Sequence, residues 1–101
     1  MEIKIYISQS AITNIENSIN YAEDVLGAFA FARSLTNEFS QFLRNVASFP
    51  EMYPLMQDEK LRAKNYRRAL IKSYVAIYEY NGKEIFIHGF FHQSQDYARF
   101  L

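Results

Sequence analysis

The fold is decided by residues 66–101, which read YRRALIKSYVAIYEYNGKEIFIHGFFHQSQDYARFL. Residues 64–71, 73–80 and 84–91 are rich in β-branched and aromatic side chains, a composition typical of strands. The dipeptide Asn81-Gly82 favours a two-residue hairpin turn, because both residues readily adopt the positive φ angles that such a turn requires. The stretch therefore predicts three consecutive antiparallel strands followed by a short C-terminal helix or tail.

The predicted hairpin has two apolar faces. If Asn81 and Gly82 form the loop, Tyr80 lies opposite Lys83 and Ile77 lies opposite Phe86. One face then carries Val75, Ile77, Phe86, His88 and Phe90, and the other carries Tyr74, Ala76, Tyr78, Ile85, Ile87 and Phe91. Strands that are apolar on both sides are typical of a sheet that is covered on both faces. We expect helices on one face, and either a partner or the folded-back segment 96–101 on the other.

The first half of the chain predicts one strand and two helices. Residues 2–7 alternate polar and apolar side chains, which is the pattern of a half-buried strand. A helix is expected to begin after Ser8 or Ser10 as its N-cap and to end at Gly27. A second helix is expected over residues 28–49, which end at a proline.

The two helices should pack as an antiparallel hairpin against the sheet, because each has an apolar stripe with positions three and four residues apart. The stripe of the first helix consists of Ile12, Ile15, Ile19, Ala22 and Leu26, and that of the second consists of Ala28, Ala32, Leu35, Phe39, Phe42, Val46 and Phe49. We assign both stripes to core packing. Residues 50–60, with two prolines, are predicted to form a loop.

Length and composition exclude several classes of protein. At 101 residues the chain fits one domain, residues 1–101, with a single core. It has no cysteine, which removes disulfides and thiolate metal sites, and its two histidines make a poor metal site, so we expect neither a metal nor another cofactor. The opening MEIKIYIS reads as neither a signal peptide nor a membrane span, and a cytoplasmic location is expected.

Charge is distributed unevenly along a chain whose formal net charge is zero. Residues 1–59 contain three basic and eight acidic side chains, whereas residues 60–101 contain eight basic and three acidic ones. Between Lys60 and Lys72 there are six basic residues and no acidic one. Such a concentration suits phosphate oxygens or an acidic protein segment, and the alternative is a solvated strand edge on which basic residues discourage aggregation.

The order of strand, helix hairpin, basic strand, β-hairpin and short tail resembles the RelE/ParE toxin superfamily of bacterial type II toxin–antitoxin systems. The residues that carry the resemblance are Tyr66-Arg67-Arg68, Tyr74, Tyr78, Asn81-Gly82, the segment 92–97 and Leu101. The resemblance covers essentially the whole chain. It implies an α+β fold in which an N-terminal strand and three C-terminal antiparallel strands form a sheet with the helix hairpin on one face.

The resemblance implies two alternative activities. In the RelE branch the toxin enters the ribosomal A site and cuts mRNA without a metal, which requires a base, cations for the developing charge and an acid. In the ParE branch the toxin is not a nuclease and inhibits DNA gyrase by protein–protein contact.

The nuclease pattern is partly met by three residues. Arg67 matches a basic position on the strand before the hairpin, Tyr97 matches the C-terminal tyrosine, and His92 lies near a position that is often basic. In a nuclease they would supply charge stabilisation, stacking or acid help, and proton transfer, respectively.

Other positions depart from the nuclease pattern. Ala69, Ile71 and Val75 stand where ribosomal nucleases carry further cations. Losing one stabiliser of the developing charge commonly lowers the rate by about 10²–10³-fold. His88, opposite Val75 in the predicted register, partly compensates for this loss or is a structural residue.

The missing cations, the neutral overall charge and the acidic helical half favour the ParE-like branch. The leading hypothesis is a toxin that binds a protein target, DNA gyrase by analogy, with growth inhibition and plasmid stabilisation as its expected roles. The alternatives are a ribosome-dependent mRNA endoribonuclease and a non-toxic co-repressor that only binds its partner.

The expected partner is a cognate antitoxin, a small DNA-binding protein with an acidic or amphipathic tail. DNA would be contacted only through this antitoxin, no membrane is involved, and a heterotetramer or larger complex is compatible with the resemblance. The residues predicted to bind the partner are Arg67, Arg68, Lys72, Val75, Ile77, His88 and Phe90. For the two arginines, which should point to opposite faces of their strand, ion pairing within the chain is the alternative.

Overall fold

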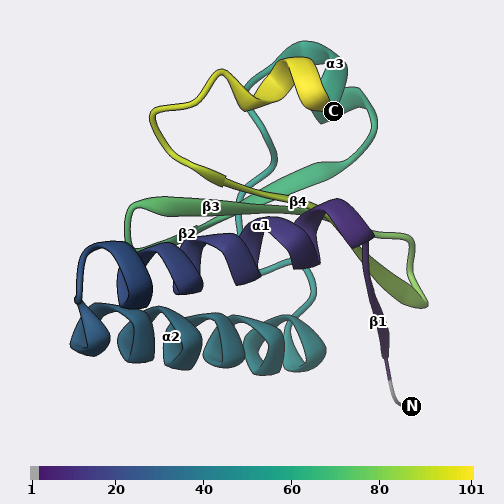
Figure 1. Cartoon of the computed structure of the whole chain (residues 1–101). Helices are drawn as coiled ribbons and strands as arrows, with labels where there is room; N and C mark the ends of the chain where they lie inside the picture. Colours follow the sequence, from purple (N-terminus) through teal and green to yellow (C-terminus); the bar gives the residue numbers. More distant parts are fainter. Residues whose placement is uncertain (1–2) are drawn as a thin grey trace.

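The computed structural model describes residues 3–101 as an α+β fold (Figure 1). Its elements are β1 (Lys4–Ile7), α1 (Gln9–Asn20), a π-helical turn η1 (Tyr21–Val25), α2 (Phe29–Ser48), α3 (Glu59–Ala63), β2 (Tyr66–Ile71), β3 (Tyr74–Tyr80), β4 (Glu84–His92) and a 3₁₀ turn η2 (Tyr97–Phe100). The expected N-terminal strand, helix hairpin, three C-terminal strands and terminal helical segment are all present.

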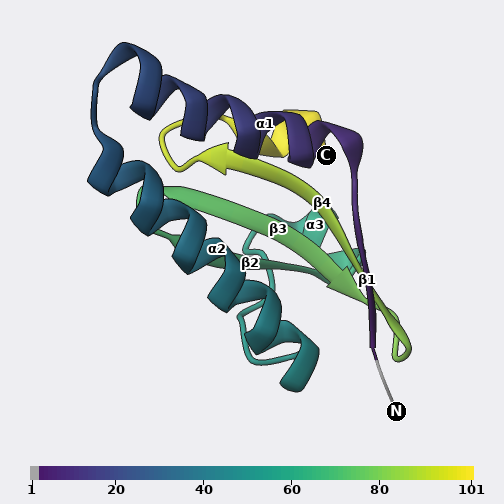
Figure 2. The same cartoon turned by 60° about the horizontal axis from the view of Figure 1, so that its bottom comes forward.

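The four strands form one sheet in the order β1-β4-β3-β2. The strands β2, β3 and β4 are antiparallel neighbours, whereas β1 lies parallel to β4 at one edge. The helices α1 and α2 lie on one face of the sheet, and α3 with the C-terminal segment lies on the other (Figures 1 and 2). Both faces are therefore covered, as the apolar pattern predicted.

The helix hairpin begins and turns where the sequence indicated. The Ser8 hydroxyl caps α1 by accepting a hydrogen bond from the backbone N–H of Ala11 at 3.1 Å. Gly27 has a φ of 63°, a left-handed conformation that favours glycine, and the chain reverses there into α2. The two helices run antiparallel across the sheet (Figure 2).

The larger core lies between the helix hairpin and the sheet. Its fully buried members include Leu35, Phe42 and Val46 from α2, which pack with Tyr78 and Ile85 of the sheet. Burying a large apolar side chain contributes about 1.5–3 kcal/mol, so this layer is the main source of stability.

A second, smaller core covers the other face. Its buried members are Met56, Leu61, Val75, Ile77 and Phe91, and the partly buried Tyr66, Tyr97, Ala98 and Leu101 pack against them. The expectation that the terminal segment folds back onto the sheet is thus confirmed.

Helix α3 was not predicted, since its residues were assigned to the end of a loop and the approach to a strand. The Asp58 side chain caps it by accepting hydrogen bonds from the N–H groups of Lys60 and Leu61 at 3.0 and 3.1 Å. Leu61 then points into the smaller core with only 3% of its surface exposed. A single turn of helix leaves too little periodicity to be read from sequence.

The predicted hairpin register is wrong by two residues. Tyr80 pairs with Ile85 instead of Lys83, so four residues, 81–84, lie between the last paired positions instead of two. The Asn81 side chain accepts hydrogen bonds from the N–H groups of Lys83 and Glu84 at 2.9 and 2.7 Å, and this side-chain turn replaces the tight two-residue turn. Because the shift is an even number, it does not by itself change which face each residue occupies.

A β-bulge changes the faces of β4. Tyr78 pairs with Ile87 and Ile77 pairs with Gly89, which leaves His88 as the extra residue. Beyond the bulge Phe90 joins the core under the helices, and Phe91 joins the smaller core on the opposite face. The sequence had assigned these two phenylalanines the other way round, because strict alternation does not anticipate a bulge.

The packing of Phe91 beyond the bulge depends on Gly89, because a Cβ atom added there would overlap the ring of Phe91. We expect Gly89→Ala to lower the free energy of unfolding by about 1–3 kcal/mol, measured by urea denaturation, since the ring must leave its place in the smaller core. The double variant Gly89→Ala/Phe91→Leu should lose less free energy of unfolding than the two single variants lose in sum. Strict additivity of the two losses would contradict this account.

Candidate functional site

The basic strand β2 places its two arginines on opposite faces of the sheet, as expected. Arg67 pairs with Tyr78 and lies on the helix side, whereas Arg68 pairs with Ile77 and lies on the side of α3 and the tail. The two side chains therefore meet different surroundings and perform different tasks.

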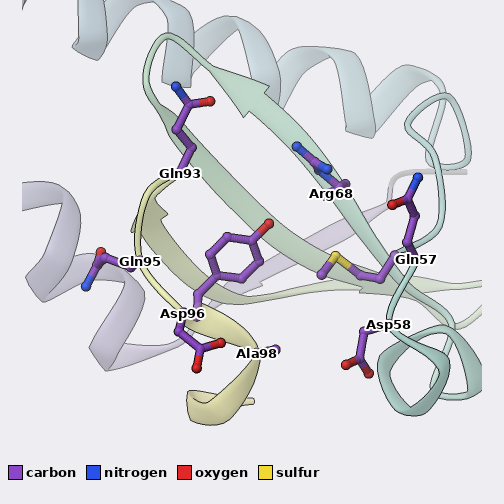
Figure 3. A pocket seen from close by; sticks show the side chains of 9 residues that line it. Gln57, Asp58, Arg68, Gln93, Gln95, Asp96 and Ala98 are labelled. Carbon is purple, nitrogen blue, oxygen red and sulfur yellow. The ribbon is translucent and has the colours of Figure 1, made fainter.

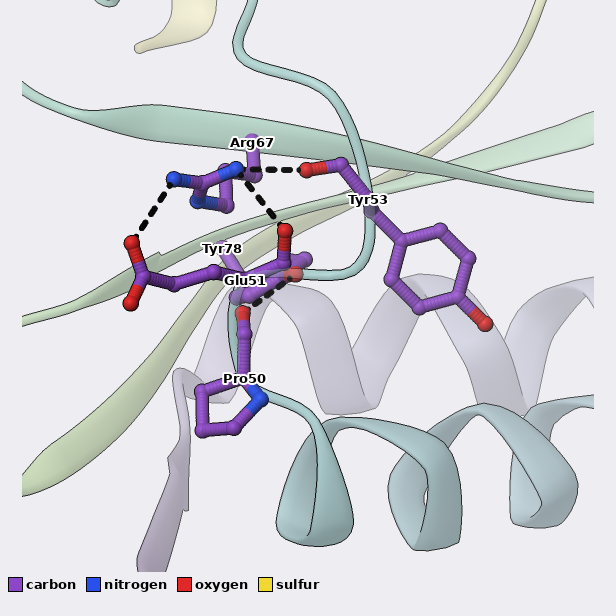
Figure 4. Close-up of polar contacts among 5 residues, drawn as sticks. All are labelled: Pro50, Glu51, Tyr53, Arg67 and Tyr78. Carbon is purple, nitrogen blue, oxygen red and sulfur yellow. Dashed lines mark hydrogen bonds and ion pairs between the residues drawn. The ribbon is translucent and has the colours of Figure 1, made fainter.

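Arg67 is held by the loop that follows α2 (Figure 4). One guanidinium nitrogen donates hydrogen bonds to the carbonyl oxygens of Tyr53 at 2.7 Å and Glu51 at 3.2 Å. The other lies 3.4 Å from the Glu51 carboxylate. The ion-pairing alternative thus describes Arg67, whose side chain is only 17% exposed.

A buried tyrosine reinforces the same loop. The Tyr78 hydroxyl donates a hydrogen bond to the carbonyl oxygen of Pro50 at 2.8 Å, and the residue has no exposed surface. Burial raises the pKa of Tyr78 to about 12, although the nearby positive charge of Arg67 opposes this. Together, Arg67 and Tyr78 fix residues 50–53 on the sheet.

Lys72 is also neutralised within the chain. It lies in the turn between β2 and β3 with a φ of 55°, and its ammonium group is 3.1 Å from the Glu38 carboxylate of α2. The same nitrogen lies 5.4 Å from the centre of the Phe31 ring. Lys72 therefore links the turn to α2 on the helix side of the sheet.

Arg68 lines a polar pocket of about 290 Å³ between the tail and the loop before α3 (Figure 3). The pocket is lined by Met56, Gln57, Asp58, Arg68, Gln93, Gln95, Asp96, Tyr97 and Ala98. Arg68 lies with Gln57 and Asp58 on one side, and Gln93, Gln95 and Asp96 lie on the other. Within residues 3–101 Arg68 forms no ion pair, so its charge is available for a ligand or partner.

A second hollow continues this pocket along the seam between α3 and the tail. It has a volume of about 270 Å³ and shares Asp58 and Ala98 with the first. Its cations are Lys60, Lys64 and Arg99. We call these three residues together with Arg68 the basic seam. The two hollows also contain the carboxylates of Asp58 and Asp96, which the four cations outnumber, so the seam retains a positive charge by count.

The other residues predicted to bind a partner are engaged within the fold. Val75 and Ile77 have no exposed surface beneath the tail, and Phe90 is buried on the helix side, where the bulge places it. His88 lies 2.7 Å from the Glu79 carboxylate and stacks on the Tyr66 ring with 4.6 Å between ring centres. Sequence reasoning did not select the other cations of the seam, although two of them belong to the basic run it had noted.

The three nuclease candidates are not brought together. Arg67, His92 and Tyr97 line three different pockets. The His92 Nδ1 atom is 2.7 Å from the Ser94 hydroxyl, and Tyr97 stacks on Phe91 on the opposite face. Among residues 3–101 there is also no group of three potential metal ligands.

The model of one protein family, the ParE toxin of the parDE type II toxin–antitoxin system, matches residues 5–97. The chain belongs to the ParE toxin family. It is therefore a toxin of a type II toxin–antitoxin system, and membership of this family implies a cognate antitoxin. No curated protein sequence matches the chain significantly.

Solved structures share the fold of this toxin. A chain from the chromosomal ParDE system of P. aeruginosa aligns with a TM-score of 0.68 at 11% identity, covering 89% of this chain and 95% of the other. YafQ from E. coli strain BL21(DE3) aligns with a TM-score of 0.58 at 16% identity, covering 91% of this chain and 94% of the other. In the described part of the toxin, residues 3–101, no helix has both the length and the apolar character needed to span a membrane.

The raised pKa of Tyr78 predicts a loss of stability in alkali. Because the folded-state pKa of about 12 lies above the ordinary value of 10.0, the free energy of unfolding should be unaffected by this group below pH 10 and fall as the pH rises towards 12. Urea denaturation at several pH values should show that the free energy of unfolding falls less steeply above pH 10 in Tyr78→Phe than in the parent protein. An equal loss in both proteins would contradict the assignment.

The contacts of Arg67 predict a structural role. Arg67→Gln should lower the free energy of unfolding by about 1–3 kcal/mol, because two backbone carbonyls lose a charged donor. Glu51→Gln is the matched control and should cost less than about 1 kcal/mol, since the Glu51 side chain is 70% exposed. Equal losses, measured by urea denaturation, would show that the carboxylate rather than the carbonyls holds Arg67.

Proposed function

We propose that this toxin inhibits growth by binding a protein target through the basic seam, with DNA gyrase as the target by analogy with the ParE family. The observation that carries the proposal is the free charge of Arg68 in a polar pocket, beside three further cations along the same seam. Guanidinium groups of this kind favour bidentate contact with carboxylates, which an acidic protein segment supplies.

The separation of the nuclease candidates supports binding rather than RNA cleavage. Acid–base catalysis requires its groups within hydrogen-bonding reach of one reacting centre. Arg67, His92 and Tyr97 lie in different pockets, and Arg67 is already occupied by two carbonyl oxygens. A ribosome-dependent endoribonuclease built on these three residues therefore has less support than a binding protein.

The cognate antitoxin would neutralise the toxin by covering the same seam. An acidic or amphipathic tail complements Lys60, Lys64, Arg68 and Arg99 in charge, and it would leave the DNA-binding part of the antitoxin free. The predicted apolar contacts at Val75 and Ile77 become available only if the tail covering them is displaced. In this proposal the complex acts in the cytoplasm, contacts DNA only through the antitoxin and contains two or more copies of each protein.

A gyrase supercoiling assay with the purified toxin tests the target. We expect inhibition by the parent protein and at least about tenfold weaker inhibition by Arg68→Ala, because an ion pair with a partner carboxylate would be lost. Arg33→Ala, which changes an exposed arginine of α2, is the matched control and should inhibit like the parent. Full supercoiling at a large molar excess of toxin would reject gyrase as the target.

Induction of the toxin in cells, with and without the antitoxin, distinguishes the remaining alternatives. Growth arrest by the toxin alone would reject a non-toxic co-repressor. Cleavage of mRNA on translating ribosomes, lost in His92→Ala or Tyr97→Phe, would replace the binding mechanism with the nuclease one. Arrest without cleavage, relieved by Arg68→Ala and not by Arg33→Ala, is the result that the proposal expects.

A further inference from the structure

The turn of the helix hairpin exposes a group of large apolar side chains. Tyr21, Val25, Leu26 and Phe29 are 55%, 65%, 61% and 63% exposed. We call these four residues the hairpin tip. They lie at the end of the hairpin away from both termini (Figures 1 and 2). Apolar side chains scattered singly on a surface are ordinary, whereas four within nine residues at one turn call for an explanation.

The local backbone contributes to this exposure. The N–H of Leu26 bonds to the carbonyl of Tyr21 at 3.2 Å, and that of Ala28 bonds to the carbonyl of Ala22 at 2.7 Å, so the last turn is wider than an α-helical turn. An α-helical continuation would have kept Leu26 in the apolar stripe predicted from sequence. The wide turn moves it out of phase, and π-helical turns occur frequently at functional sites.

The hairpin tip carries a charge opposite to that of the basic seam. Residues 5–32 contain no lysine, arginine or histidine, and their charged side chains are Glu16, Glu23 and Asp24. Two of these three carboxylates lie within η1 itself. The next basic residue is Arg33, one helical turn beyond Phe29 in α2, so the charged side chains nearest the tip, Glu23, Asp24 and Arg33, still leave a net negative charge by count. This balance disfavours contact with anionic lipid headgroups and favours a basic protein segment bound on the η1 side of the tip.

We infer that the hairpin tip is a second docking surface, which accepts a basic amphipathic segment of a partner protein. Apolar side chains of the segment would cover Val25, Leu26 and their neighbours, and its lysines or arginines would face Glu23 and Asp24. The tip lies at the turn of the helix hairpin, whereas the basic seam lies on the opposite face of the sheet. A partner on the tip and an acidic segment on the seam can therefore be bound at the same time.

Two synthetic peptides provide the probe. Both have fourteen residues with leucine at helical spacing, and the remaining positions are lysine in one and glutamate in the other. Fluorescence anisotropy with the full chain should show saturable binding of the lysine peptide, and a higher salt concentration should weaken this binding because ion pairs to Glu23 and Asp24 contribute to it. The glutamate peptide suits the basic seam instead, so Arg68→Ala should weaken its binding and leave binding of the lysine peptide unchanged.

Variants assign the binding to the tip. Val25→Ser/Leu26→Ser should weaken binding of the lysine peptide at least about tenfold, since two exposed apolar side chains are removed from the tip. Phe49→Ser is the matched control, because Phe49 is 67% exposed at the other end of α2, and it should bind like the parent. Thermal unfolding should be unchanged in both, which shows that binding is altered without loss of the fold.

Three results would overturn the inference. The first is binding of the lysine peptide that Val25→Ser/Leu26→Ser leaves unchanged, or that Arg68→Ala weakens. The second is a dimer of the parent in sedimentation that this variant abolishes, which would assign the tip to a second copy of the chain. The third is sedimentation of the parent, and not of the variant, with phosphatidylcholine vesicles, which would assign the tip to a lipid surface.

Discussion

Four consecutive residues of β3, from Val75 to Tyr78, have no exposed surface, so each face of the sheet needs a layer of its own. The helix hairpin covers Ala76 and Tyr78, and α3 with the tail covers Val75 and Ile77. This double coverage gives the tail a structural task and creates the seam that it forms with α3. The candidate site is therefore a product of the need to bury the second face of β3.

The same constraint separates the cations of the basic run. Basic residues on the helix side lie near the acidic half of the chain, where Arg67 forms an ion pair with Glu51 and Lys72 forms one with Glu38. Arg68, on the other face, lines a pocket with three glutamines and with Asp58 and Asp96, and it forms no ion pair with either carboxylate. Arg67 thus holds a loop in place while the adjacent Arg68 remains available for binding, solely because successive side chains of a strand point to opposite faces of the sheet.

The sequence predicted the order of the elements well, because long amphipathic stripes and a hairpin signal are local patterns. It could not reveal the bulge at His88, which reverses Phe90 and Phe91, or the wide turn that exposes Leu26, because each is one residue out of a regular period. The basic run was visible, but the partners of Arg67 and Lys72 lie 16 and 34 positions away in the chain. Which cation remains free is a property of the tertiary structure.

The parallel pairing of β1 with β4 also determines how the molecule assembles. Lys4 lies opposite Glu84, and the strand order gives β1 no other neighbour. Closing this pair brings together residues 80 positions apart, which is a costly loop closure and a feature of slowly folding topologies. In a chain emerging from the ribosome, β2 and β3 can pair before β4 is made, whereas β1 and α1 lack the strand that they contact. During that interval the apolar stripe of α1 is open to chaperones or to early binding partners.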